Sequence, residues 1–270
     1  MMNRKISENI NIGIIGGTGI YDPSLFNVIE ERKINTPFGE PSDKITICSL
    51  GNKKIAFIPR HGKEHRLPPH KINFRANIWA LKDLGVKTIL APSAVGSLKK
   101  EFKPGNIAIP DQYIDFTKKR DYTFYDGGVV CHISQAEPFC NDLREIICHQ
   151  LEKLNVSYHH KCTYVCIEGP RFSTKAESNY YRNVLDANII GMTLIPECIL
   201  AREMEICYLS IATVTDYDVW ADIHVSSKEI VKTLGKNVEK VRTLLLNTIP
   251  KISEKRDNCN CGKSLENALI

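Results

Sequence analysis

The feature that most restricts the fold of this chain is a regular alternation of short β-branched runs with segments of helical periodicity. The runs that predict strands cover residues 10–15, 54–59, 86–91, 162–167, 187–190 and 207–215. The segments with helical spacing cover residues 73–84, 137–154, 173–185 and 226–246. Strands that alternate with helices are typical of a mostly parallel sheet flanked by helices. We therefore expect an α/β fold with a twisted, mostly parallel or mixed central sheet in a single domain.

The length and composition of the chain are those of an ordinary globular protein. Its 270 residues are 43% hydrophobic and 25% charged, and one α/β domain can reach this size. We expect residues 1–252 to form that domain and residues 253–270 to form a polar, cysteine-containing tail. No apolar run approaches the roughly 20 residues needed to cross a bilayer, and the start of the chain lacks the apolar segment of a signal peptide. The sequence thus predicts a soluble, cytoplasmic protein without a membrane partner.

The basic residues do not follow the pattern of a nucleic-acid-binding protein. The net charge is +5, but Lys and Arg are scattered, and their strongest clusters, at residues 99–100 and 118–120, are short. Such runs are usually solvated faces. We expect no nucleic-acid partner.

Almost every predicted strand ends in a glycine-rich or polar cluster. These clusters cover residues 16–19, 60–62, 93–96, 168–172, 191–193 and 216–218. In open α/β sheets, ligands bind in the crevice at the carboxyl ends of the strands. The clusters are therefore expected to converge on one site.

Two of these clusters have the chemistry of an anion site. The GGTG turn at residues 16–19 can bring backbone N–H groups close to an anion, although such a turn can also be purely structural. Arg60 directly follows a strand, and its guanidinium matches phosphate oxygens, while the imidazole of His61 would add another donor. The turn is neither the GxGxxG fingerprint, since Asp22 stands where the last glycine would fall, nor a GxxxxGK[ST] loop. The sequence therefore favours a bound oxyanion over a dinucleotide or ATP hydrolysis.

A metal site is not expected among the nearby histidines. His61, His65 and His70 are close in sequence, but the glycine at 62 and the prolines at 68 and 69 break any helix that would present them together. No HExxH arrangement is present.

Asp216 and Asp218 place two carboxyl groups on the same side of an extended segment, because strand side chains alternate with period two. Such a pair can be a metal site, a solvated loop, or an acid that protonates a leaving group. A heterocycle with a ring nitrogen and an exocyclic amine would suit it, since a protonated carboxyl donates to the nitrogen and the other carboxyl accepts from the amine. Phe172 could stack on such a ring or belong to the core.

The chain contains ten cysteines, many for a cytoplasmic protein. Their spacing lacks the paired CxxC units of a structural zinc site, so we expect either reduced thiols or the intracellular disulfides known from hyperthermophiles. Neither Cys140 nor Cys207 belongs to the polar clusters, and we expect these two to pair. Cys259 and Cys261 are expected to bond to each other or to attach the tail to the body.

In combination, the motifs GGTG, RHG, SAVGSL, AEPF, EGPRF, GMT and DYD resemble the trimeric purine nucleoside phosphorylase family, over residues 12–250. The chain is most similar to the branch of that family that acts on 5′-methylthioadenosine. The resemblance implies cleavage of the N-glycosidic bond by inorganic phosphate, which yields adenine and 5-methylthioribose 1-phosphate. It also implies that no metal or organic cofactor is needed, phosphate being a co-substrate, and that the protein is a homo-oligomer, either a trimer or two stacked trimers.

The resemblance also assigns roles to individual residues. Those expected to bind phosphate are Thr18, Arg60, His61, Ser93, Ala94 and Thr193. Those expected to bind the nucleoside are Glu168, Phe172, Met192, Ile230, Val231 and His132, the last by reaching a neighbouring subunit's pocket. The resemblance makes Asp216 and Asp218 the catalytic residues, in contact with N7 and the amino group of the base.

Three alternative functions remain beside this expectation. A nucleosidase would use water and need no anion site, which the predicted phosphate ligands argue against. A purine nucleoside phosphorylase of broad or 6-oxopurine specificity would need a donor at the 6-position rather than two carboxyl groups. A noncatalytic nucleoside-binding protein would keep the fold without turnover.

Overall fold

The computed structural model describes residues 10–17, 25–221, 227–254 and 259–270, without the side chains of residues 227–232 and 234. The strands are β1 (Ile12–Gly16), β2 (Asn27–Arg32), β3 (Ile45–Leu50), β4 (Lys53–Pro59), β5 (Thr88–Ser97), β6 (Ile107–Ala108), β7 (Gln112–Phe116), β8 (Tyr158–His159), β9 (Thr163–Ile167), β10 (Ile189–Gly191) and β11 (Cys207–Asp216). The α-helices are α1 (Phe74–Asp83), α2 (Asn141–Lys153), α3 (Lys175–Asn183), α4 (Glu197–Glu203) and α5 (Ser227–Thr248).

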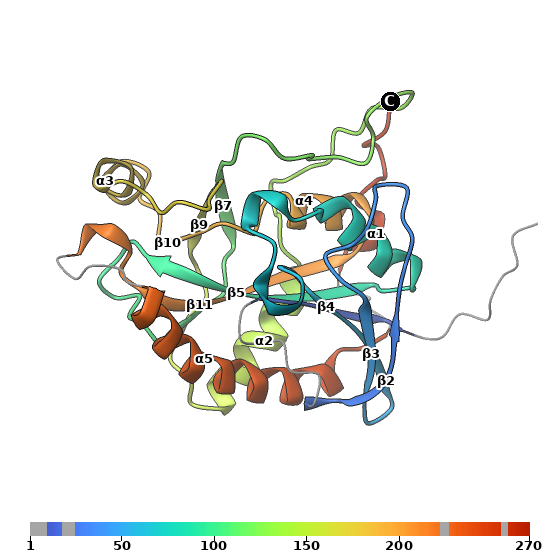
Figure 1. The fold of residues 1–270 in the computed structure, drawn as a ribbon, viewed down its shortest axis with the longest axis horizontal. Coiled ribbons are helices and arrows are strands. Elements are labelled where there is room, and N and C mark those ends of the chain that lie inside the picture. The colour runs from blue at the N-terminus through green and yellow to red at the C-terminus, as the bar shows by residue number, and fades with distance from the viewer. Residues whose placement is uncertain (1–9, 18–24, 222–226, 255–258) are drawn as a thin grey trace, which may run out of the picture.

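The strands form one mixed sheet, shown in Figure 1. Its main path is β2-β3-β4-β1-β5-β10-β9-β7, and β11 pairs with β5 and β6, which in turn pairs with β8. β4, β1, β5 and β11 run parallel to one another, so their carboxyl ends lie at the same edge. The β2–β3–β4 meander and the β5–β10 pair are antiparallel. The predicted α/β fold with a mostly parallel or mixed sheet is confirmed.

The sheet branches at β5. The first residues of β5 lie between β1 and β11, whereas its last two residues, Gly96 and Ser97, pair with β10. Nearly all residues of β5 and β11 are buried, which is why neither strand shows the polar–apolar alternation of a half-exposed strand. Because β5 and β11 are adjacent and parallel, their carboxyl ends lie side by side at one edge of the sheet.

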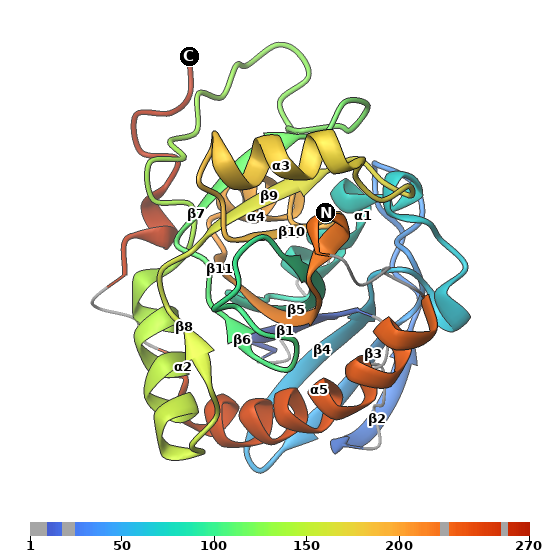
Figure 2. The ribbon, with the colours of Figure 1, turned by 90° about the vertical axis from the view of Figure 1, so that its left-hand side faces the viewer.

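Helices cover both faces of the sheet. In Figures 1 and 2, α1 and α4 lie on one face, and α2 and α5 on the other. Local signals set their ends: the side chain of Asn73 caps α1 by accepting the N–H of Ala76, and Gly85 follows α1 with a φ of +92°. Thr174 and Glu177 form a capping box at the start of α3. Each helix and strand predicted above is present, whereas α4 and the strands β2, β3, β6, β7 and β8 were not predicted.

The described tail residues return to the body of the protein. Cys131 forms a β-bridge with Leu269, and Val130 exchanges two backbone hydrogen bonds with Ile270. All ten cysteines are free, so neither predicted disulfide is present, although the four cysteines named for them do lie together. Among the described residues, no helix combines the length and the apolar character that a membrane span requires.

Candidate active site

A cavity of about 240 Å³ opens where β1, β4, β5 and β11 end. Nine of the residues expected to bind phosphate, to bind the nucleoside or to act in catalysis line it: Arg60, His61, Ser93, Ala94, Phe172, Met192, Thr193, Asp216 and Asp218. The polar clusters that follow these strands therefore meet at one site.

Glu168 is not among the residues that line this cavity. Its carboxylate accepts the backbone N–H of Lys118 at 2.6 Å, and its other oxygen lies 3.5 Å from Nε of Arg120. Both contacts hold the loop that follows β7. The structure thus places Glu168 in contact with the loop after β7 of its own chain and outside the cavity wall.

Four more expected site residues do not line the cavity of their own chain or cannot be placed. The segment that contains His132 pairs with the tail, where His132 N–H donates to the carbonyl oxygen of Ala268 at 2.8 Å. Thr18 lies outside the described residues. Ile230 and Val231 belong to the start of α5, but their side chains are outside the described part of the structure.

Arg60 is a buried cation in the cavity wall, only 1% exposed. Its Nε and Nη2 donate to the carboxylate of Glu197 at 2.7 and 2.8 Å, and Nη1 donates to the carbonyl oxygen of Pro92 at 3.0 Å. Burial by itself would lower the pKa of Arg60, but the charge of Glu197 raises that pKa above its ordinary value. Because Glu197 occupies the Nε–Nη2 edge, a ligand can reach only the remaining N–H groups of Nη1 and Nη2.

Besides its two hydrogen bonds with Arg60, Glu197 accepts a third, from Tyr208. It is completely buried at the start of α4, and the hydroxyl of Tyr208 donates to its Oε1 at 2.8 Å. A buried carboxylate needs such partners, because an unpaired charge in the interior is costly. The cation of the cavity wall is therefore fixed by a carboxylate and a phenol that lie behind it.

His61 is a neutral ring in this site. Its Nδ1 lies 2.9 Å from the carbonyl oxygen of Leu67, which can only accept, so Nδ1 carries the proton and Nε2 is bare. The ring stacks on His65, with the centroids 4.0 Å apart. Burial lowers the pKa of His61 to about 3. In the neutral form, with Nδ1 donating to Leu67, Nε2 of His61 accepts a hydrogen bond, whereas the sequence predicted a donor at this residue.

Ser93 lies on β5, and Thr193 lies two residues beyond the end of β10, which runs antiparallel to β5. Ile190 pairs with Gly96, so the chain after β10 runs back along β5 toward Ser93. Both side chains line the cavity and are almost buried. Since the carbonyl before Ser93 is the one that Arg60 contacts, these two hydroxyl-bearing residues lie on the cationic side of the cavity.

Asp216 and Asp218 form an acidic pair at the end of β11, in which Asp216 is half-buried and Asp218 is buried. Oδ2 of Asp216 accepts the Thr215 hydroxyl at 2.7 Å, and its Oδ1 accepts the backbone N–H of Asp218 at 2.8 Å. Oδ2 of Asp218 accepts the Ser178 hydroxyl at 2.5 Å. Burial raises the pKa of both carboxyl groups above the ordinary value for aspartate. The pair can therefore hold a proton at a pH at which an exposed aspartate has lost it.

The rest of the wall is largely apolar and includes Pro69, Phe172, Ile190 and Met192. Met192 packs closely because Gly169 has no side chain: a Cβ added there would lie 2.6 Å from the sulfur of Met192, and the φ of Gly169 is +66°. Phe172 is 46% exposed, so its ring edges the mouth of the cavity. A flat ligand ring can stack against it.

Several residues that support the site were not predicted from the sequence, among them Ser178, Thr215, Glu197 and Tyr208. Glu197 did give a signal, since it is a single acid in the apolar segment LIPECILA at residues 194–201, and a buried acid requires a cationic partner. Ser178 gave none, because it lies on a helix rich in polar residues, where a serine is ordinary.

The cationic and acidic parts of the cavity are separated along β5. Arg60 contacts the carbonyl of Pro92, whereas Asp216 pairs with Gly96. At about 3.3 Å per residue, these positions on β5 lie roughly 13 Å apart. The cavity can thus hold an oxyanion at one end and a nitrogen heterocycle at the other, with a group of the size of a sugar between them.

Comparisons with known proteins agree with this chemistry. Residues 11–250 match the family model of the phosphorylase superfamily. The chain is 54% identical to the S-methyl-5′-thioadenosine phosphorylase of Saccharolobus solfataricus over 266 residues, which are 98% of each chain. Among solved structures, it resembles a methylthioadenosine phosphorylase from an antarctic soil metagenomic library, with a TM-score of 0.91, 42% identity and coverage of 97% of this chain and 93% of that one. It also resembles the Schistosoma mansoni methylthioadenosine phosphorylase in complex with adenine, with a TM-score of 0.88, 37% identity and 95% coverage of each chain.

Proposed function

The chain belongs to the phosphorylase superfamily, and we propose that its cavity is the active site for phosphorolysis of 5′-methylthioadenosine to adenine and 5-methylthioribose 1-phosphate. The protein is an enzyme, a pentosyltransferase, since its nearly full-length relatives are S-methyl-5′-thioadenosine phosphorylases. The observation that carries the assignment of the site is the separation of a buried cation, Arg60, from the Asp216–Asp218 carboxyl pair within one cavity. This spacing suits a phosphate, a sugar and a purine in that order.

Phosphate is the ligand proposed for the cationic end. The free N–H groups of Arg60 would donate to its oxygens, together with the hydroxyls of Ser93 and Thr193 and the backbone N–H of Ala94. Neutral His61 would accept a hydrogen bond from the O–H group that phosphate still carries near neutral pH. This arrangement both holds and orients the nucleophile, and such preorganised donors are worth several kcal/mol in enzymes.

The carboxyl pair acts on the leaving base. As an oxygen of phosphate forms a bond to C1′, the bond from C1′ to the purine nitrogen breaks and its electron pair moves onto the purine. The protonated carboxyl of Asp216 donates its proton to N7, so that the base leaves uncharged. Asp218, if ionised, accepts from the exocyclic amine. The raised pKa of Asp216 suits a general acid that must remain protonated.

The carboxyl pair also sets the preferred base. A carboxylate accepts a hydrogen bond from a 6-amino group but repels a 6-oxo group at the same place. A mismatched buried polar group costs about 1–3 kcal/mol, or roughly ten- to a hundredfold in kcat/KM. The site therefore favours 6-aminopurines over inosine and guanosine.

A homo-oligomer, either a trimer or two stacked trimers, is proposed to complete the site. His132 does not line the cavity of its own chain, and it lies on a segment next to Val129 and Val130, which are 43% and 51% exposed. Exposed valines on a segment fixed by the tail fit a surface that another subunit covers. In the oligomer, His132 would approach the 5′ end of the nucleoside in the neighbouring cavity, and Ile230 and Val231 would border the methylthio group.

The direct test is adenine release from methylthioadenosine with and without phosphate. We expect release only with phosphate, and a rise of the phosphate KM with a loss of at least about tenfold in kcat/KM in Arg60→Ala, which corresponds to about 1.4 kcal/mol. Release at the same rate in phosphate-free buffer would identify a nucleosidase instead. Binding without turnover would identify a noncatalytic nucleoside-binding protein.

A further inference from the structure

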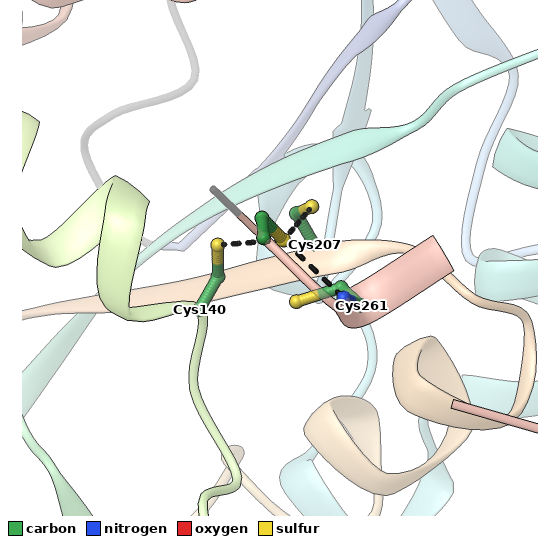
Figure 3. Close-up of side chains that lie close together, drawn as sticks. Cys140, Cys207 and Cys261 are labelled. Carbon is green, nitrogen blue, oxygen red and sulfur yellow. Dashed lines mark hydrogen bonds between the residues drawn. The ribbon is translucent and has the colours of Figure 1, made fainter. Parts of the chain in front are cut away.

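Four cysteine thiols meet where the C-terminal tail returns to the body, at the opposite end of β11 from Asp216. They belong to Cys140 before α2, Cys207 at the start of β11, and Cys259 and Cys261 in the tail, and their sulfur atoms all lie within 4.8 Å of one another. Figure 3 shows Cys140, Cys207 and Cys261 converging from separate parts of the ribbon. The proposed reaction uses none of them.

The distances between the sulfur atoms are those of ligands around one ion. Sγ of Cys259 lies 3.5 Å from Sγ of Cys140 and 3.3 Å from Sγ of Cys207. Four thiolates at about 2.3 Å from a central zinc ion in tetrahedral geometry are about 3.8 Å from one another, whereas the sulfurs of a disulfide are only about 2.05 Å apart. The observed spacing is close to the first value and well above the second.

We propose that Cys140, Cys207, Cys259 and Cys261 bind one Zn²⁺ ion. A set of four soft sulfur ligands selects zinc over the hard cations magnesium and calcium. Binding converts the four thiols to thiolates and releases their protons to solvent. Because all four positions of the tetrahedron are filled by protein, the site is structural and has no open position for a substrate.

The surroundings of the cluster support a closed site. Cys140 and Cys207 are buried, and the two tail cysteines are half-buried over them. The backbone N–H of Cys261 points to Sγ of Cys259, at 3.3 Å, and such N–H donors stabilise a metal-bound thiolate. The sequence did not predict this site, because its ligands come from three separate segments and the tail pair is CxC rather than CxxC.

The consequence of this site is that zinc would fasten the tail to the body. The same tail continues to Ala268 and Ile270, which hydrogen-bond to the backbone of His132 and Val130. Ser264 adds a contact to the carbonyl oxygen of Arg202 at 2.6 Å. Through this connection the ion would hold the segment that carries His132 in place. An effect of the ion on nucleoside binding rests on the proposed function, whereas the metal site itself does not.

The test is the metal content and thiol state of the full-length protein, purified without chelator and without added reductant. We expect one zinc per chain by elemental analysis, and an unreduced chain whose mass after denaturation equals that of the fully reduced chain. Cys259→Ser combined with Cys261→Ser should lose the zinc, whereas Cys148→Ser, which alters a half-buried cysteine outside the cluster, should keep it. Cobalt(II) exchanged into the wild-type protein should give the absorption bands of a tetrahedral thiolate site, a measurement that needs no variant to fold.

Two disulfides in the unreduced chain would overturn the proposal. So would ten free thiols without metal after incubation with Zn²⁺, iron in place of zinc, or zinc retained by the double variant. None of these readouts depends on turnover, so a failure of the metal site and a failure of the proposed reaction can be told apart. If both proposals hold, removal of the tail pair should also raise the nucleoside KM more than the phosphate KM.

Discussion

Glu197→Gln removes the negative charge from the Arg60–Glu197 pair while it keeps the side-chain volume, and it therefore tests what the charge contributes. Glu197 is fully buried and holds the Arg60 guanidinium by two charge-assisted hydrogen bonds of 2.7 and 2.8 Å. Glutamine keeps the volume but leaves the buried cation without its anion, which costs about 3–5 kcal/mol. At about 2–4 °C per kcal/mol for a chain of this size, the melting temperature should fall by roughly 6–20 °C.

Phosphate should restore more stability to this variant than it adds to the wild-type protein. The reason is that phosphate supplies an anion to a guanidinium that has lost one, and a ligand stabilises the native state according to its affinity for it. Thermal unfolding measured against phosphate concentration, with sodium chloride at matched ionic strength, gives the two responses. Glu203→Gln is the matched control, since Glu203 is a buried acid on the same helix that accepts from Thr123 and Phe124 and does not line the cavity.

Two results would refute this reasoning. An unchanged melting temperature in Glu197→Gln would show that the ion pair does not stabilise the fold. An equal phosphate response in wild type, Glu197→Gln and Glu203→Gln would show that phosphate does not meet Arg60. The control variant should be less stable than wild type but should show the wild-type response to phosphate.

Three further predictions concern the nucleoside end of the site. Because burial raises the pKa of Asp216, this carboxyl group stays protonated to a higher pH than an exposed aspartate does. The kcat should therefore fall as the pH rises through that pKa. Asp216→Asn should remove this falling limb of the kcat–pH profile. Asp218→Asn should shift the ratio of kcat/KM for methylthioadenosine and inosine toward inosine, because an amide can donate to a 6-oxo group where the carboxylate accepted from the 6-amine. Asp216→Asn should shift this ratio less, because N7 is present in both bases. A ratio that does not move in either variant would show that the pair does not read the 6-position. When His132→Ala subunits are mixed with Asp216→Ala subunits, the mixed oligomers should regain part of the wild-type activity, because one interface can combine an intact His132 with an intact Asp216. No recovery after verified subunit exchange would argue against a shared site.

The sequence predicted the fold well because the signals for it are local. Each apolar run that ends in a glycine or polar cluster proved to be a strand, and the cap residues Asn73 and Thr174 begin helices at the expected places. The short strands β6 and β8 were missed because two residues carry no periodicity. Helix α4 was missed because its seven residues are buried along most of their length and show no polar face.

The sequence predicted which residues gather at the site, but not how their hydrogen bonds are shared. Nothing local in the RHG motif indicates that Glu197, 137 positions further on, takes the bidentate edge of Arg60, or that Leu67 takes the only N–H of His61. These are long-range or loop contacts that only the folded chain creates. The sequence paired Cys140 with Cys207 and predicted that Cys259 and Cys261 bond to each other or attach the tail to the body, but it did not predict one cluster of four, because that depends on the return of the tail.

The central claim is that the oxyanion held near Arg60 becomes part of the product. Phosphorus-31 NMR of the enzyme incubated with methylthioadenosine and inorganic phosphate tests it directly, because it reports the fate of phosphorus independently of adenine release. The account predicts that the inorganic phosphate signal declines while a sugar 1-phosphate ester appears, in equal amounts with adenine. Adenine accompanied by free methylthioribose, with the phosphate signal unchanged, would contradict it.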